Sequence, residues 1–184
     1  MKKLLERIKL CKLPPPQRRS LPYECYWEDS ILTQEQERIF SNQWLGLGRS
    51  DRLENTGEYE VFELCGQALV LIRNQDKELR LYANTCRHRG AKLLDGTGQC
   101  QAISCPFHGW TYSLDGNLKH AKTMAENPSF DFEEHSLIEY KLKELQGFLF
   151  VFLGNKPTDL SNQLGNFSEL HQPWSMNELV TTRR

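Results

Sequence analysis

The chain has 184 residues, 39% of them hydrophobic and 26% charged, and a formal net charge of −1. That length can bury one proper core with some appendages, and the charge gives no electrostatic case for nucleic acid or a membrane surface. No apolar run approaches the roughly 20 residues of a transmembrane helix. Without a recognisable secretory signal, the scattered Cys11, Cys25, Cys65 and Cys100 predict reduced thiols and a cytoplasmic protein.

Residues 1–20 are a basic arm with seven Lys or Arg and one Glu, which leaves 16 basic and 23 acidic residues in the remainder. Pro14-Pro15-Pro16 near its end favours a stiff, extended backbone. The arm is either a solvated extension or an amphipathic docking or targeting segment. The second reading depends on apolar residues near helical spacing: Leu4, Leu5, Ile8 and Leu10.

Residues 21–53 are interpreted as a helical lead-in. Thr33-Gln34-Glu35-Gln36 has the spacing of a capping box, in which the first and fourth residues cap the start of a helix. It predicts a helix from about Thr33 to Asn42 that buries Ile39 and Phe40.

Residues 54–157 carry β signals, and many short strands with turns between them predict an antiparallel β-sandwich. The expected strands are Tyr59–Leu64, Ala68–Arg73, Leu79–Tyr82, Trp110–Tyr112, Leu137–Leu145 and Phe148–Leu153. Residues 158–184 have only scattered apolar anchors, so they are expected to be a tail or the start of a further domain. Those anchors are Leu164, Phe167, Leu170 and Trp174.

Two short runs carry the chemistry. Cys86-Arg87-His88 reads C-x-H, and after sixteen residues Cys105-Pro106-Phe107-His108 reads C-x-x-H. A thiolate and an imidazole from each run are the ligands of a mixed Cys/His iron–sulfur centre, with Cys on one iron and His on the other. A zinc finger instead groups a Cys pair and then a His pair.

The flanking residues agree with a metal site, but they leave alternatives open. Gly90 and Gly109 follow the two runs and allow a backbone to bend tightly around a cluster, while Pro106 stiffens the second loop. Zinc in the same four ligands is one alternative, because ligand type alone does not choose the metal. The other is two unrelated Cys/His pairs in a core and on a surface.

Residues 84–91 (Asn-Thr-Cys-Arg-His-Arg-Gly-Ala) and 104–112 (Ser-Cys-Pro-Phe-His-Gly-Trp-Thr-Tyr) resemble the Rieske domain of Rieske non-haem iron oxygenase large (α) subunits. That family includes ring-hydroxylating dioxygenases and choline-monooxygenase-like enzymes. The resemblance covers roughly residues 20–157. It implies a Rieske-type β-sandwich with a small cluster-binding lobe and a short N-terminal helix. It also implies one 2Fe–2S cluster on Cys86, His88, Cys105 and His108.

The resemblance also assigns a surrounding shell, namely Gly90, Gly109, Trp110 and Tyr112. Rieske proteins of cytochrome bc complexes have an additional Cys in each loop, and here those positions are Ala91 and Phe107, so no bridge can form. Their Ser donor corresponds to Trp110, whereas Tyr112 matches their Tyr donor. Fewer donors to the cluster imply a potential toward the low end of the Rieske range.

An oxygenase of this family also needs a mononuclear Fe(II) held by two His and a carboxylate. Apart from the cluster residues the chain has only His120, His135 and His171, which are too far apart in sequence for that motif. We therefore expect an α-subunit fragment, a truncated product or a stand-alone carrier that does not oxygenate substrate alone.

The expected function is electron transfer from a ferredoxin or reductase to an oxygenase catalytic domain, with a homotrimer in the full-length protein. The alternatives are a stand-alone Rieske electron carrier and a redox- or iron-sensing module. The presence or absence of a catalytic domain encoded just downstream would distinguish them.

Overall fold

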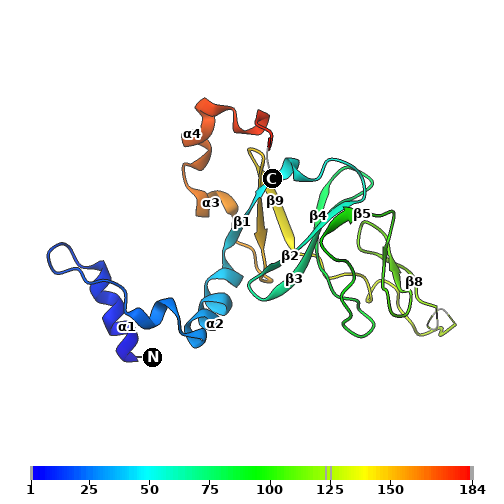
Figure 1. Cartoon of the computed structure of the whole chain (residues 1–184), viewed down its shortest axis with the longest axis horizontal. Coiled ribbons are helices and arrows are strands. Elements are labelled where there is room, and N and C mark those ends of the chain that lie inside the picture. The colour runs from blue at the N-terminus through cyan, green and yellow to red at the C-terminus, as the bar shows by residue number, and fades with distance from the viewer. Residues whose placement is uncertain (1, 123, 125, 183–184) are drawn as a thin grey trace. The chain divides into compact units, whose positions relative to one another are not determined.

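The structure is a computed structural model that describes residues 2–122, 124 and 126–182 (Figure 1). The chain divides into two compact units, residues 1–41 and 42–184. The α-helices are α1 (Lys2–Lys9), α2 (Asp29–Arg38), α3 (Leu160–Leu164) and α4 (Phe167–His171). Short 3-10 helices span Leu10–Lys12, Tyr23–Tyr26, Phe40–Asn42, Ser50–Arg52, Gln172–Trp174 and Met176–Glu178. Within the described ranges, no helix is long and apolar enough to cross a bilayer.

The first unit is helical, but its main helix lies earlier than the capping box predicts. Helix α2 starts at Asp29, where an acidic side chain complements the helix dipole. Thr33 lies inside it, and its hydroxyl donates to the Asp29 carbonyl at 2.9 Å instead of capping. The predicted burial of Ile39 is wrong because its side chain is 50% exposed, and Phe40 is only half-buried. No residue of α2 is buried, since a unit this small cannot cover a helix on several sides.

The second unit is built from three antiparallel sheets. Their orders are β1-β10-β9, β4-β3-β2-β5 and β6-β7-β8. The strands are β1 (Trp44–Arg49), β2 (Glu58–Leu64), β3 (Gln67–Arg73), β4 (Leu79–Ala83), β5 (Thr97–Gln99), β6 (Ile103–Ser104), β7 (Thr111–Tyr112), β8 (Leu118–His120), β9 (Lys141–Leu145) and β10 (Phe148–Phe152). The predicted antiparallel β architecture with a short N-terminal helix is confirmed.

Two tight hairpins fix the register of the larger sheets. Cys65-Gly66 joins β2 to β3 and Gln146-Gly147 joins β9 to β10, and all four residues have positive φ. Such two-residue turns match the twist of the strands that they connect. The predicted strands over Tyr59–Leu64 and Ala68–Arg73 are confirmed within two residues at each end.

Two segments differ from the sequence interpretation. The lead-in contains a strand as well as helices, because β1 pairs along β10. The strand expected from Leu137 begins only at Lys141, and residues before it are held through an isolated bridge between Tyr82 and Glu139. Hydrophobicity alone does not distinguish a paired strand from an extended segment that meets the sheet at one point.

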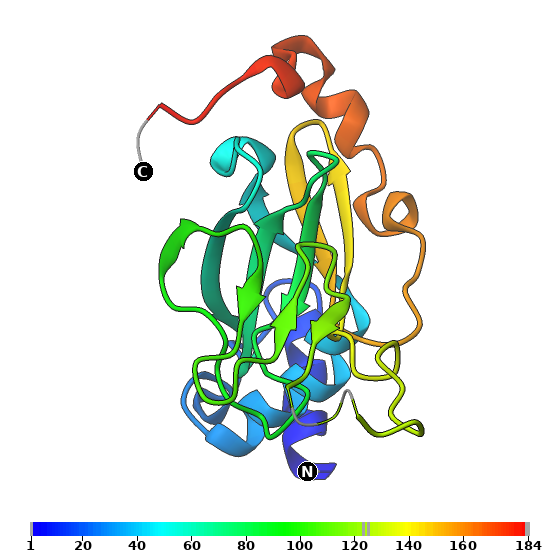
Figure 2. The same cartoon turned by 90° about the vertical axis from the view of Figure 1, so that its right-hand side faces the viewer.

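Strands β3 and β4 of the four-stranded sheet are buried on both faces, which explains the continuous apolar run in β3. Leu69, Leu71 and Leu81 face one cluster, which also contains Leu149, Val151 and Leu153 from β10 and the residue after it. Val70, Ile72 and Tyr82 face a second cluster with the lobe that carries the two Cys/His loops. Figure 2 shows the green strands of this sheet beside the yellow β9–β10 hairpin, and the two sheets together form the sandwich.

The tail covers the outer face of β10. Leu160, Leu164 and Phe167 from α3 and α4 pack against Phe150 and Phe152. The other two predicted anchors, Leu170 and Trp174, are largely exposed. The tail nevertheless returns to the sheet, since the Arg49 guanidinium donates to the Met176 carbonyl at 2.8 Å.

Candidate iron–sulfur site

The two Cys/His loops have the same backbone construction. In the first, Cys86 N–H donates to Ala91 O at 2.7 Å and Gly90 N–H donates to Cys86 O at 3.0 Å. In the second, Cys105 N–H donates to Trp110 O at 2.8 Å and Gly109 N–H donates to Cys105 O at 3.1 Å. Each loop therefore runs five residues from Cys to Gly, with His third in the first loop and fourth in the second.

Each loop closes at a glycine with positive φ, +74° at Gly90 and +68° at Gly109. Non-glycine residues adopt this left-handed conformation only with strain, so both glycines have a steric reason to be there. An added Cβ at Gly109 would meet nothing within 4 Å. The requirement at that position is therefore conformational and not a matter of space.

The surrounding sheet holds both loops in place. The second loop is the turn between β6 and β7, whose last pair is Ser104 opposite Thr111. The first loop follows β4 and is closed by Asn84, a buried amide that donates to Leu94 O at 2.8 Å and accepts from Leu94 N–H at 3.0 Å. Both loops are thus pinned at their bases by main-chain or buried side-chain hydrogen bonds.

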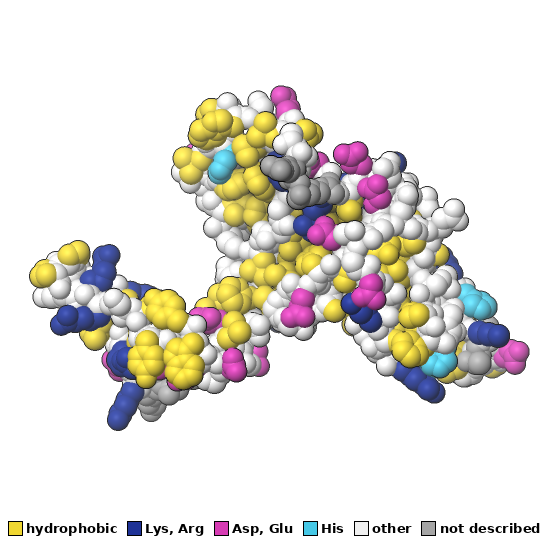
Figure 3. All heavy atoms as spheres, viewed as in Figure 1, with side chains coloured by type: hydrophobic (Ala, Val, Ile, Leu, Met, Phe, Trp, Pro, Cys, Tyr) yellow, Lys and Arg dark blue, Asp and Glu magenta, His cyan; other side chains and the backbone are white. Residues whose placement is uncertain are grey.

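The structure brings all four sequence-predicted residues together. The imidazole rings of His88 and His108 lie with centroids 4.8 Å apart at an interplanar angle of 77°. Cys86 and Cys105 are buried, His88 is half-buried and His108 is exposed. The four side chains line one pocket of ≈ 560 Å³, together with Arg89, Ala91, Lys92 and Phe107. Figure 3 shows His and Lys or Arg side chains gathered at this end of the unit, near β8.

The donor atoms fit an iron–sulfur cluster. Both cysteines are free thiols, and Nδ1 of His88 is buried without a hydrogen-bond partner among the described residues. A buried polar atom left unpaired is costly, and metal ligation would satisfy it. Over residues 2–122, 124 and 126–182, no group of three or more His, Cys, Asp or Glu surrounds a single ion position. Two cysteines and two histidines line one pocket, and they are the donor set that a mixed Cys/His two-iron cluster needs.

The electrostatic surroundings favour neutral imidazole at His88. Burial lowers the pKa of His88, and the nearby Arg89 and His108 lower it further. Neutral imidazole is the form that ligates a metal.

Tyr112 lies beside the first cysteine. Its Oη is 3.4 Å from Cys86 Sγ and accepts a hydrogen bond from Arg87 N–H at 3.0 Å. Burial raises the pKa of Tyr112, and the contact with Cys86 raises it further. The phenol is therefore held protonated, with its hydrogen free to point toward sulfur.

The sequence did not predict that Phe130 and His135 lie near the site. Trp110, buried at 2% exposure, stacks flat on His88 and makes T-shaped contacts with Phe130 and His135. Phe130 and His135 lie in an irregular segment with no periodic pattern, twenty or more residues after Trp110. Their aromatic character was the only sequence signal available.

Two loops that each present one cysteine and one histidine from an antiparallel β lobe are typical of iron–sulfur proteins with mixed ligation. The chain belongs to the Rieske [2Fe-2S] domain family, whose sequence model matches residues 43–137. Its relatives are Rieske oxygenase α subunits.

The carnitine monooxygenase oxygenase subunit of Escherichia coli K12 is 34% identical over 151 residues, which cover 82% of this chain and 40% of the relative. The glycine betaine monooxygenase oxygenase subunit of Chromohalobacter salexigens is 30% identical over 162 residues, covering 87% and 36%. The chain thus spans about 40% or less of the length of these relatives.

Solved structures agree on the fold. The apo form of a quaternary ammonium Rieske monooxygenase superposes with a TM-score of 0.83 at 32% identity, covering 90% of this chain and 49% of that one. Naphthalene 1,2-dioxygenase from Rhodococcus sp. has a TM-score of 0.80 at 23% identity, covering 92% and 39%. The second likeness concerns the fold alone.

Proposed function

We propose that this chain is the electron-transfer domain of a ring-hydroxylating-type oxygenase α subunit. It would accept electrons from a ferredoxin or reductase and pass them to a mononuclear iron centre held by residues outside this chain. The observation that carries the proposal is the convergence of two matched loops on one pocket, where the buried Nδ1 of His88 has no hydrogen-bond partner in the part of the chain that the structure describes. Family membership supports it independently.

In this proposal Cys86 and Cys105 hold one iron of a 2Fe–2S cluster, and His88 and His108 hold the other. When bound, the cluster supplies a site that stores and releases one electron at a time. The protein contributes the geometry: the loops fix the four ligands, Tyr112 donates toward a cysteine sulfur, and the β lobe buries the thiolate side. His108 presents an exposed imidazole toward a redox partner.

The same proposal includes the organisation of the chain. Residues 1–20 are the basic arm, 21–53 the lead-in, 54–157 the Rieske domain and 158–184 a tail that leads toward a catalytic domain. In this division the lead-in contributes β1 to the sheet of the Rieske domain. The acceptor is that catalytic domain, the full-length protein is a homotrimer, and the compartment is the cytoplasm.

Metal analysis of anaerobically prepared protein tests the site. We expect two irons and two labile sulfides per chain. Cys86→Ser and Cys105→Ser should abolish the cluster, and His88→Ala and His108→Ala should strongly impair it. Cys100→Ser is the matched control, since this partly buried free thiol lies between the loops but outside the pocket, and it should keep the full cluster. Zinc without labile sulfide in the wild-type protein would overturn the assignment.

Redox assays test the role. The reconstituted chain should be reduced by dithionite or by a ferredoxin–reductase pair and then be reoxidised, without hydroxylating any substrate. Substrate-dependent O₂ uptake by the iron-reconstituted chain alone would contradict the proposed electron-transfer role.

A further inference from the structure

A parallel stack of rings supports the imidazole of His88. The indole of Trp110 lies 4.9 Å from it between centroids, with only 12° between the planes, whereas His108 meets it edge-on. The torsion that sets the plane of a histidine ring has broad preferences of its own. Because Nδ1 finds no hydrogen-bond partner in the described part of the chain, packing must fix the plane. Trp110 provides the flat contact that does so.

Trp110 is in turn held by a second layer of rings. Its main-chain carbonyl closes the second ligand loop, and its side chain is buried. The Phe130 ring makes a T-shaped contact with the indole, with centroids 5.6 Å apart and 78° between the planes. The His135 ring makes another, at 5.8 Å and 71°. Phe130 and His135 also contact each other at 4.4 Å. These T-shaped contacts, each favourable by about 0.5–1.5 kcal/mol beyond area burial, restrict the orientation of the indole.

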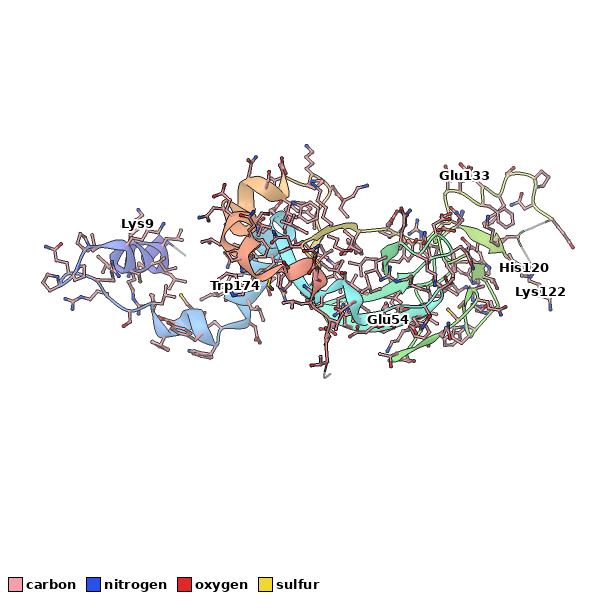
Figure 4. The ribbon with its side chains drawn as sticks, turned by 90° about the horizontal axis from the view of Figure 1, so that it is seen from above. Lys9, Glu54, His120, Lys122, Glu133 and Trp174 are labelled. Carbon is pink, nitrogen blue, oxygen red and sulfur yellow. The ribbon has the colours of Figure 1, made fainter. Side chains whose placement is uncertain are left out.

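The segment that carries these two rings is ordered by its own hydrogen bonds. Phe130 N–H donates to Asn127 O at 3.0 Å, and His135 Nδ1 lies 2.7 Å from Asp131 O. Ser136 Oγ accepts from the N–H of Leu118 at 3.3 Å, which ties the segment to β8. In Figure 4, Glu133 from this segment lies at the same end of the unit as His120 on β8.

We propose that Trp110 is a positioning residue for His88, and that Phe130 and His135 act on His88 through Trp110. The proposal rests on the proposed function, in which His88 ligates the cluster. Iron–imidazole overlap depends on the orientation of the ring, and partners outside the ligand shell tune a metal centre through such orientation. Trp110, Phe130 and His135 supply no ligand atom, but they would thus affect how firmly the cluster is held and the EPR spectrum that it gives.

The test compares four reconstituted and reduced proteins: wild type, Trp110→Leu, Trp110→Phe and Trp44→Leu. Trp44 is the matched control, because it is also a buried tryptophan (4% exposed) but packs on Phe152 in another cluster. Trp110→Leu should shift the EPR g-values and accelerate iron loss to a chelator by about tenfold, the low end for losing such a partner. Trp110→Phe should restore most of both. Trp44→Leu should lower Tm and leave both readouts at the wild-type values.

A second variant tests the route through Trp110. Phe130→Leu should shift the g-values in the same direction as Trp110→Leu, by less, and should have no additional effect when Trp110 is already Leu. If Trp110→Leu does not fold, Phe130→Leu against Trp44→Leu decides the question. Unchanged g-values and iron-loss rates in these variants, or equal changes in Trp44→Leu, would overturn the positioning role while leaving the cluster assignment intact. A wild-type chain that binds no iron and sulfide would instead refute the proposed function.

Discussion

Removing one oxygen atom from Tyr112 should lower the midpoint potential of the cluster. Arg87 N–H donates to the phenol oxygen at 3.0 Å, so the hydroxyl hydrogen is left to point at Cys86 Sγ, 3.4 Å away. Reduction adds negative charge to the cluster and its thiolates, so a donor to sulfur stabilises the reduced state more than the oxidised state. Tyr112→Phe removes that donor and keeps the buried ring.

The size of the shift follows from hydrogen-bond energies. A hydrogen bond to a charged group contributes about 1.5–3 kcal/mol, and only its difference between oxidation states changes the potential. If that difference is about 1 kcal/mol, it corresponds to about 40 mV, since 59 mV is tenfold for one electron. The expected change is therefore a decrease of about 40 mV.

Protein-film voltammetry at fixed pH measures the shift, and Tyr82→Phe is the control. Tyr82 is also fully buried, but its hydroxyl donates to Leu114 O at 3.3 Å, away from the ligand loops. Its removal should leave the potential unchanged. A potential that stays constant or rises in Tyr112→Phe, or an equal shift in Tyr82→Phe, would refute the donor role.

Three further outcomes are expected. The midpoint should lie near −150 mV. Because reduction adds negative charge beside His88 and so favours its protonated form, the midpoint should fall as pH rises, measured by voltammetry across pH. Asn84→Ala should lower the urea unfolding free energy by about 2–3 kcal/mol, since it leaves both main-chain groups of Leu94 unpaired. In the same assay, Gly57→Ala should lower the unfolding free energy more than Gly109→Ala. Both glycines have positive φ, but only the added Cβ at Gly57 would lie 2.0 Å from Cys100 O. Gly109→Ala should lower it by about 1–2 kcal/mol.

The turn geometry of the two Cys/His loops was predictable because its constraints are local. Cys, His and Gly at short spacing specify a turn and its donor atoms together, and Gly90 and Gly109 do adopt the left-handed conformation that such turns need. The run Ala68–Arg73 was likewise readable as a strand. Its two clusters, one on each face, also explain why it shows no polar alternation.

The parts that could not be predicted depend on distant packing. No periodicity links Phe130 or His135 to Trp110, because irregular segments carry no repeating pattern. The burial expected of Ile39 failed for a related reason: hydrophobic character does not specify whether a partner surface exists. Helix α2 starts before the predicted cap, so Thr33 lies inside it and its hydroxyl bonds to the helix backbone four residues earlier.

The C-x-H and C-x-x-H motifs differ in spacing although their loops share the same backbone hydrogen bonds, and the structure explains the difference. Ala91 and Trp110 occupy equivalent positions, each accepting the hydrogen bond from its own cysteine N–H. Ala91 is small and lines the pocket, whereas Trp110 is large and stacks on the histidine of the other loop. His88, third in its loop, meets that indole and is half-buried, while His108, fourth in its loop beside Gly109, is exposed. The position of His88 in the first loop is therefore matched to Trp110, the residue that follows Gly109 in the second loop. This match gives the pair one anchored imidazole and one that faces solvent.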